Sequence, residues 1–209
     1  MAIDFTSLGA GVEAPQETVP ATPGISLDLK KNALLDLGKA APGLTKVDLC
    51  AGWDVSASGT DFDLDISVLA CHEGGKILSA NDVIFYNHKE VPGILLNGDN
   101  RTGAGDGDDE IISIILSEVD PSVSKLVCCV TIDQAAARHQ TFGMVSNSYV
   151  RLVNKETGAE IAKFVLKDDY ATSTAIVFAE LVRDNGNWVF HTIGEGLVGD
   201  LNQVAARFQ

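Results

Sequence analysis

Hydrophobic and polar residues alternate with a period of two along much of the chain, a pattern that indicates β-strands. The clearest run covers residues 60–70, where Phe62, Leu64 and Ile66 occupy alternate positions. Turn signals rich in Asn, Asp and Gly separate this run from the others. The further strands are predicted at residues 25–29, 46–53, 83–86, 111–116, 125–132, 149–153, 160–166, 174–182 and 188–193.

Two segments favour short helices instead. Residues 134–140 are rich in Ala, and apolar residues recur on one helical face of residues 200–208, at Leu201, Val204, Ala205 and Phe208. Many short strands with few helices are typical of a β-sandwich. We therefore expect an all-β fold, a β-sandwich of two mainly antiparallel sheets with short helices, including a C-terminal helix.

The length of 209 residues suits one domain. The strand pattern begins near Ile25, so the domain is expected to cover residues 25–209. Residues 1–24 carry three prolines and little periodicity, and we expect them to form a flexible leader or an edge segment.

Residues 97–110 combine acids and glycines at unusual density, in the order Asn-Gly-Asp-Asn-Arg-Thr-Gly-Ala-Gly-Asp-Gly-Asp-Asp-Glu. Carboxylates this close repel one another, and ordering glycines costs chain entropy. A hard cation would offset both costs, and Ca²⁺ suits a flexible oxygen-lined loop better than Mg²⁺ does. A solvated acidic turn is the alternative. The candidate ligands in the loop are Asp99, Asp106, Asp108, Asp109 and Glu110.

A second group of acids lies on the predicted strand at residues 60–70. Asp61, Asp63 and Asp65 share one face of this strand, although Asp is depleted in strands. We expect Asp63 and Asp65 to complete the metal site that the loop begins. A solvent-facing acidic ladder is the alternative.

Other motifs are weaker. The loop is not an EF-hand, because Arg101 takes the third position counted from Asp99. Gly194, Gly196 and Gly199 match the spacing of dinucleotide-binding loops, but no second strand follows, which favours a strand-to-helix turn. The four histidines are scattered, and no P-loop, nucleophile elbow or zinc motif occurs. We therefore expect no enzyme.

The formal charge is −14 and the sequence has no basic patch, which argues against nucleic acid as a direct partner. The N-terminal residues lack the basic and apolar regions of a signal peptide. No apolar run approaches the ~20 residues of a membrane helix. A cytoplasmic protein without membrane insertion is therefore expected.

The four cysteines show no metal-binding spacing. Cys128 and Cys129 are neighbours in a predicted strand, so they point to opposite faces and cannot readily hold one metal. We expect buried, reduced thiols at all four positions, Cys50, Cys71, Cys128 and Cys129. A soft-metal or oxyanion-reducing thiol site is the alternative.

The loop resembles the signature of the TerD family of calcium-binding domains, G-D-N-x-T-G-x-G-x-G-D-D-E. The chain matches this pattern at Gly98, Asp99, Asn100, Thr102, Gly103, Gly105, Gly107, Asp108, Asp109 and Glu110. Segments elsewhere also fit the family in order, namely Gly52-Trp53-Asp54, Phe62-Asp63-Leu64-Asp65, Phe85-Tyr86-Asn87 and Trp188-x-Phe190. The resemblance extends over about residues 25–208.

The resemblance implies a calcium-binding β-sandwich without established catalytic activity, which acts in tellurite resistance and general stress. It adds Asn100, Thr102 and Gly103 to the metal site. It also implies partners among other tellurite-resistance and stress proteins, at the inner face of the membrane. Two alternatives stay open: a metal-dependent enzyme, or a Ca²⁺-dependent binder, acting on a small phosphorylated or nucleotide-like ligand.

Overall fold

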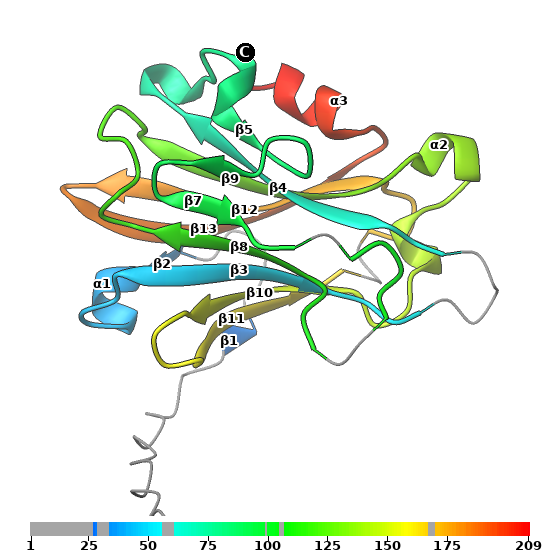
Figure 1. Ribbon diagram of the computed structural model, residues 1–209, viewed down its shortest axis with the longest axis horizontal. Coiled ribbons are helices and arrows are strands. Elements are labelled where there is room, and N and C mark those ends of the chain that lie inside the picture. Colours follow the sequence, from blue (N-terminus) through cyan, green and yellow to red (C-terminus); the bar gives the residue numbers. More distant parts are fainter. Residues whose placement is uncertain (1–26, 29–33, 56–60, 99, 105–106, 167–169) are drawn as a thin grey trace, which may run out of the picture.

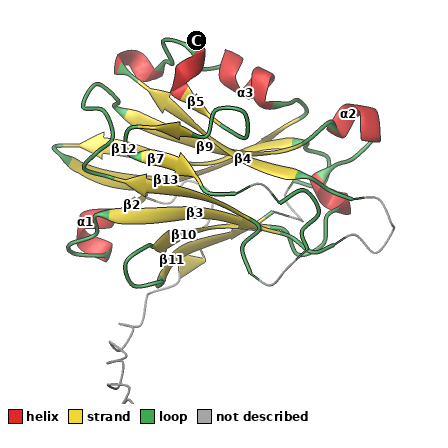
Figure 2. Ribbon diagram, in the orientation of Figure 1, coloured by secondary structure: helices red, strands yellow, loops and turns green. Residues whose placement is uncertain are grey.

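The computed structural model describes residues 27–28, 34–55, 61–98, 100–104, 107–166 and 170–209. Within them the chain forms two β-sheets packed face to face, with short helices at the periphery (Figures 1 and 2). The prediction of an all-β sandwich of two mainly antiparallel sheets is therefore confirmed. The expected leader, residues 1–24, lies outside the described residues.

The first sheet has seven strands in the order β1-β11-β10-β3-β8-β7-β6. Its described pairs are antiparallel except β1 with β11, which run parallel. The strands are β1 (Leu27–Asp28), β3 (Lys46–Gly52), β6 (Glu90–Val91), β7 (Ile94–Leu96), β8 (Glu110–Ile115), β10 (Tyr149–Asn154) and β11 (Glu160–Val165).

The second sheet has six strands in the order β2-β13-β12-β9-β4-β5, and its described pairs are antiparallel. Its strands are β2 (Leu34–Asp36), β4 (Leu64–Cys71), β5 (Val83–Ile84), β9 (Lys125–Ile132), β12 (Ala175–Asp184) and β13 (Asn187–Leu197). The helices are α1 (Leu37–Ala40), α2 (Ala135–Arg138) and α3 (Leu201–Ala206), with 3₁₀ turns η1 (Glu73–Gly75), η2 (Ala80–Asp82) and η3 (Phe142–Met144).

The period-two pattern has a direct counterpart in the core. Along β9, Leu126 and Cys128 face the other sheet, whereas Val127 and Cys129 face outward. This outward face is also buried, because α3 packs on it through Val204. The prediction of a C-terminal helix is confirmed, and the sandwich has a second, smaller hydrophobic cluster beneath that helix.

The strand predicted from residue 60 begins four positions later, at Leu64. The backbone groups before it bond to side chains and a loop instead of a neighbouring strand. The carbonyl of Phe62 accepts from Trp53 Nε1 at 3.0 Å, and that of Asp61 accepts from Gln140 Nε2 at 2.9 Å. The alternating pattern alone predicts that the strand includes this segment. It cannot indicate the actual partners of the backbone groups, because these partners lie elsewhere in the sequence.

The glycine spacing near the end of the chain also has a structural explanation. Gly194 and Gly196 lie inside β13, so the segment is mostly strand and not the tight turn expected from the sequence. A Cβ atom at Gly196 would collide with the side chain of Ser173. Close packing of the backbone accounts for this glycine without a nucleotide.

Candidate metal site

The acidic loop connects β7 to β8 at one end of the sandwich. Its two ends are fixed by backbone hydrogen bonds, from Asn97 N to the carbonyl of Ile111 and from Asp109 N to the carbonyl of Ala51, both 2.8 Å long. Two of the predicted ligands, Asp99 and Asp106, lie outside the described residues.

Asp109 occupies the part of this loop that lies against β3. Its Oδ2 accepts from the backbone N–H of Trp53 at 2.9 Å, and its Oδ1 accepts from Asn100 Nδ2 at 2.6 Å. Burial raises the pKa of Asp109, and the negative charges of Asp108 and Asp54 raise it further against the Trp53 hydrogen bond. A positive charge nearby would therefore stabilise the ionised form of the Asp109 carboxylate.

The first half of the loop folds around Asn100 and the ring of Trp53. Asn100 Oδ1 accepts from the backbone N–H of Thr102 at 3.2 Å, which forms an Asx turn. Gly103 has a φ of +69°, and a Cβ atom there would lie 2.6 Å from the Trp53 ring. Only glycine satisfies both the backbone conformation and this close approach.

Asp108 has a different environment from its neighbour. Arg151 on β10 donates to both of its oxygens, from Nε to Oδ1 at 2.8 Å and from Nη2 to Oδ2 at 2.7 Å. The hydroxyl of Tyr149 lies 3.0 Å from Oδ1. Burial by itself would raise the pKa of Asp108, but the hydrogen bonds and charge of Arg151 hold it below its usual value. Asp108 thus anchors the loop to β10.

The remaining predicted ligands lie on β8, on β4 or just before β4. Glu110 is 1% exposed, and its Oε2 accepts from the backbone N–H of Ile66 at 2.7 Å, which joins β8 to β4. Asp63 Oδ2 lies 3.2 Å from Arg101 Nε, so the loop does reach the acidic segment before β4. Asp65 is also buried, and it lies opposite Thr131 on the outer face of the second sheet.

The donor chemistry of the described loop fits a hard cation such as Ca²⁺. The Asp109 carboxylate, the Asn100 amide oxygen and the Thr102 hydroxyl are all oxygen ligands of the kind that Ca²⁺ prefers. Within the described ranges, no three His, Cys, Asp or Glu side chains form a cluster able to hold a metal. The described part of the loop thus offers the Asp109 carboxylate together with neutral oxygens, while Asp108 is bound to Arg151 and Glu110 to the backbone of Ile66.

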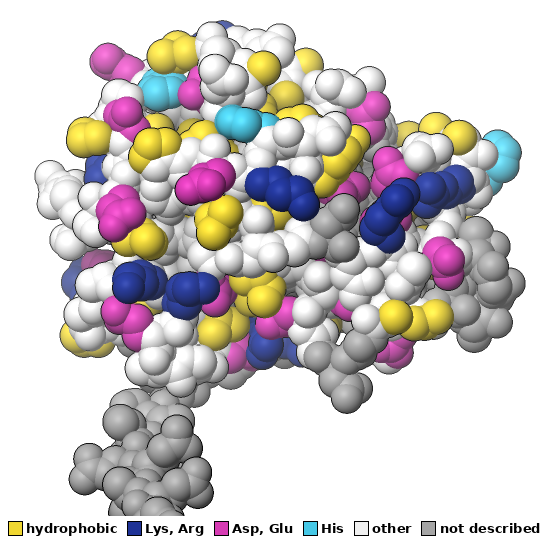
Figure 3. All heavy atoms as spheres, in the orientation of Figure 1, with side chains coloured by type: hydrophobic (Ala, Val, Ile, Leu, Met, Phe, Trp, Pro, Cys, Tyr) yellow, Lys and Arg dark blue, Asp and Glu magenta, His cyan; other side chains and the backbone are white. Residues whose placement is uncertain are grey.

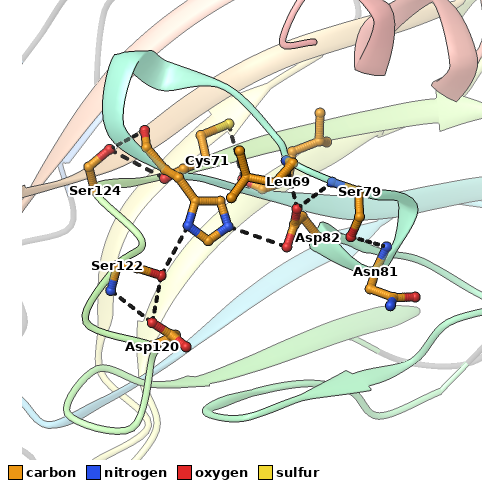
Figure 4. A network of polar contacts seen from close by, with 10 residues as sticks. Leu69, Cys71, Ser79, Asn81, Asp82, Asp120, Ser122 and Ser124 are labelled. Carbon is orange, nitrogen blue, oxygen red and sulfur yellow. Dashed lines mark hydrogen bonds and ion pairs between the residues drawn. The ribbon is translucent and has the colours of Figure 1, made fainter.

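A second polar network lies away from the loop. Figure 4 shows its members Asp82, Asp120 and Ser122, and the residue that joins Asp82 to Ser122 is His72. Its Nε2 lies 3.3 Å from Asp82 Oδ1 and its Nδ1 lies 3.0 Å from Ser122 Oγ. This order resembles a Ser-His-Asp triad, but Ser122 Oγ donates its hydrogen to Asp120 at 2.7 Å. The network therefore ties the connection after β4 to the connection before β9.

The four cysteines are buried and free of disulfides, as the sequence predicts. Burial raises the pKa of Cys71 to about 11 and that of Cys129 to about 12. It also raises the pKa of Cys50 and of Cys128. These thiols are therefore poor nucleophiles and poor metal ligands in the folded chain.

The sequence analysis missed the residues that hold the loop in place. Arg151 and Tyr149 bind Asp108, and Trp53 supports both Gly103 and Asp109. Trp53 does lie in the Gly52-Trp53-Asp54 segment that carries part of the family resemblance. The bond between Arg151 and Asp108 joins positions 43 residues apart, and no local pattern indicates it.

The chain is thus a β-sandwich protein of two sheets, with an aspartate- and glycine-rich loop at one end that offers oxygen ligands. Residues 25–208 match the family model of the TerD domain. The chain belongs to the TerD family, as its loop signature suggests.

Characterised relatives cover most of the chain. General stress protein 16U of Bacillus subtilis (strain 168) is 44% identical over 188 residues, which cover 88% of this chain and 97% of that protein. Tellurium resistance protein TerD of Serratia marcescens is 43% identical over 187 residues, with the same coverage of 88% and 97%.

A solved structure agrees in fold. A homologue of the telluride resistance protein (TerD) from Streptomyces coelicolor A3(2) superposes with a TM-score of 0.67 at 26% identity. The match covers 78% of this chain and 96% of that chain. In the part of our chain that the structure describes, no helix has the length and apolar character needed to span a membrane.

Proposed function

We propose that this chain is a non-enzymatic, calcium-binding module of the tellurite-resistance and stress response, whose acidic loop docks partner proteins when Ca²⁺ orders it. The relatives named for tellurium resistance and general stress support the cellular role. The partners would be other proteins of the same response, met in the cytoplasm at the inner face of the membrane.

The observation that carries the calcium proposal is the environment of Asp109. Its carboxylate is partly buried, lies near Asp108 and Asp54, and among the described residues receives hydrogen bonds from two neutral N–H groups, of Trp53 and Asn100. A bound cation would remove this electrostatic cost, and the surrounding oxygens suit Ca²⁺. Asp99, Asp106, Asp63 and Glu110 are the carboxylates from which further ligands would come.

The anchors of the loop also suit it to change the protein surface when Ca²⁺ binds. Asp108 is fixed to Arg151, Glu110 to Ile66, and Gly103 to the Trp53 ring. A cation held between these anchors would order the intervening chain and change its charge in one place on a rigid sandwich. Such an order–disorder switch suits a docking face.

The alternative of an enzyme or binder acting on a phosphorylated ligand has less support. Arg101 and Arg151, the basic residues beside the loop, donate to Asp63 and Asp108 and are thus engaged with carboxylates. Over the face drawn in Figure 3, Lys and Arg side chains occur in small separate groups. A site for phosphate would gather such cations toward one point.

Hydrogen exchange at residues 100–104 and 107–110 tests this proposal. We expect Ca²⁺ to slow exchange there by at least about tenfold relative to chelator-treated protein, while amides of β9 stay unchanged. Asp109→Asn should lose this protection, whereas Asp184→Asn in the exposed β12–β13 turn should keep it. Equal exchange with and without Ca²⁺ would mean that the loop is not a calcium-driven switch.

A further inference from the structure

A groove of about 1200 Å³ crosses the outer face of the second sheet, bordered by η2, α2 and α3. Figure 1 shows α3 and β5 on the upper side of the molecule and α2 beside them. Asp65 and Thr131 contribute to its floor, and none of the described residues of the acidic loop lines it. Small-molecule sites usually span roughly 300–1,000 Å³, so this groove is large enough for a polypeptide segment.

Exposed hydrophobic side chains gather along this groove. Leu78, Tyr86 and Val198 line it and are 74%, 40% and 78% exposed. They are three of the eight large hydrophobic side chains that stand exposed among the described residues. Three such residues around one hollow form an apolar surface of the kind that marks interaction sites.

The charge of the groove is acidic. Asp65, Asp133 and Asp200 line it, and its described lining contains no Lys or Arg. Of these acids, Asp133 pairs with Arg138 at 3.2 Å, so the negative charge of the groove comes from Asp65 and Asp200, while the adjoining Lys76 donates to the backbone oxygen of Gln209. An apolar surface with acidic walls is complementary to a segment that carries both apolar and basic side chains.

We propose that this groove docks a basic amphipathic segment of a partner protein, with apolar side chains against Leu78 and Val198 and with Lys or Arg facing Asp65 and Asp200. The leader of this chain does not have that chemistry, because residues 1–24 contain Asp4, Glu13 and Glu17 and no Lys or Arg. A second copy, with its formal charge of −14, is disfavoured by the same argument. The proposal does not depend on calcium.

The test uses a fluorescein-labelled synthetic peptide of about 14 residues, with Leu and Lys at amphipathic helical spacing, and a twin with Glu in place of each Lys. Fluorescence anisotropy with the full chain in chelator should show saturable 1:1 binding of the Lys peptide, and at least about tenfold weaker binding of the Glu twin. Because calcium is absent from this experiment, its outcome is separate from that of the loop proposal.

Paired variants locate the binding surface. Combining Leu78→Ser with Val198→Ser should weaken binding of the Lys peptide by about tenfold or more. Combining Leu95→Ser with Val165→Ser changes exposed residues of the first sheet, and should leave the affinity for the peptide within about twofold of the wild type. Asp200→Asn removes a charge but retains a good helix N-cap, and should weaken binding by about threefold or more. Asp184→Asn is its control.

Four results would overturn the proposal. The first three are no saturable binding of the Lys peptide, equal binding of both peptides, and groove variants that bind like the wild type. A dimer of the free protein that Leu78→Ser with Val198→Ser converts to monomer would also overturn it, because the occupant would then be a second copy. Sedimentation of the wild type and of this variant distinguishes that case.

Discussion

Asp108 and Asp109 are neighbours in the chain, yet their carboxylates meet opposite environments. Asp108 binds the Arg151 guanidinium, which holds its pKa low against burial, whereas Asp109 accepts from the N–H groups of Trp53 and Asn100 and burial raises its pKa. Asp108 therefore has a counter-charge within the fold, whereas the described groups that bind Asp109 carry no positive charge.

Replacing Arg151 by Gln tests the anchoring role of Asp108. We expect a loss of about 2 kcal/mol in the free energy of unfolding, because three charge-assisted hydrogen bonds disappear, two to Asp108 and one to Glu160, and Asp108 stays largely buried. Arg151→Lys should recover only part of the loss, since Lys cannot form the fork. Urea denaturation in chelator measures these differences.

The control for this prediction is Arg207→Gln, because Arg207 pairs with Glu195 on the surface at 2.8 Å with both side chains over 40% exposed. It should change stability by less than about 0.5 kcal/mol. Equal effects of the two Gln variants would contradict an anchoring role for Arg151.

The thiols provide a second prediction at this scale. With pKa values of about 11 for Cys71 and about 12 for Cys129, both raised by burial, the folded protein should react very slowly with a thiol-specific chromogenic reagent at pH 8. All four cysteines should react in denaturant. Rapid reaction of the native protein, or a soft metal bound in stoichiometric amount, would contradict their structural role.

Alternation of apolar and polar residues predicted the β-strands that bury one or both faces against other layers of the fold. β3, β9, β11 and β12 fall close to their expected positions, because a regular period of two leaves little choice of register. The sequence analysis missed β2, α1, β6 and β7, which span only two to four residues each. Segments this short depend on pairing with distant strands, and no periodicity can develop within them.

The connection between β4 and β5 carries a prediction for the pH dependence of stability. Burial alone would raise the pKa of Asp82, but the backbone N–H groups of Leu78 and Ser79 and the His72 ring lower it. Its contribution is therefore present above the unfolded pKa of about 4 and is lost as pH falls through the lower folded pKa. Asp82→Asn should cost about 1 kcal/mol at pH 6 and much less near pH 2.

Chemical denaturation of wild type and Asp82→Asn at pH 6 and at lower pH measures this difference. The exposed Asp184→Asn variant serves as the reference for removing a surface charge. A penalty for Asp82→Asn that stays constant down to pH 2 would show that the Asp82 carboxylate is not stabilised in the folded state.

Across the whole molecule, the sandwich positions two separate features, the acidic loop between β7 and β8 and the groove over the second sheet. The sequence predicted the loop, because its acids and glycines are consecutive. It did not predict the groove, because Leu78, Tyr86 and Val198 are brought together only by the fold. The TerD family signature lies in the loop, so the proposed binding of Ca²⁺ is the central part of the proposed function.

Isothermal titration calorimetry on chelator-treated full-length protein tests that claim most directly. We expect a saturable heat with Ca²⁺, a much weaker one with Mg²⁺, and loss of the Ca²⁺ heat in Asp109→Asn but not in Asp184→Asn. At a Ca²⁺ concentration of 100 times the dissociation constant, binding should also stabilise the fold by about 2.7 kcal/mol. The absence of a saturable Ca²⁺ heat from the wild-type protein would contradict the account.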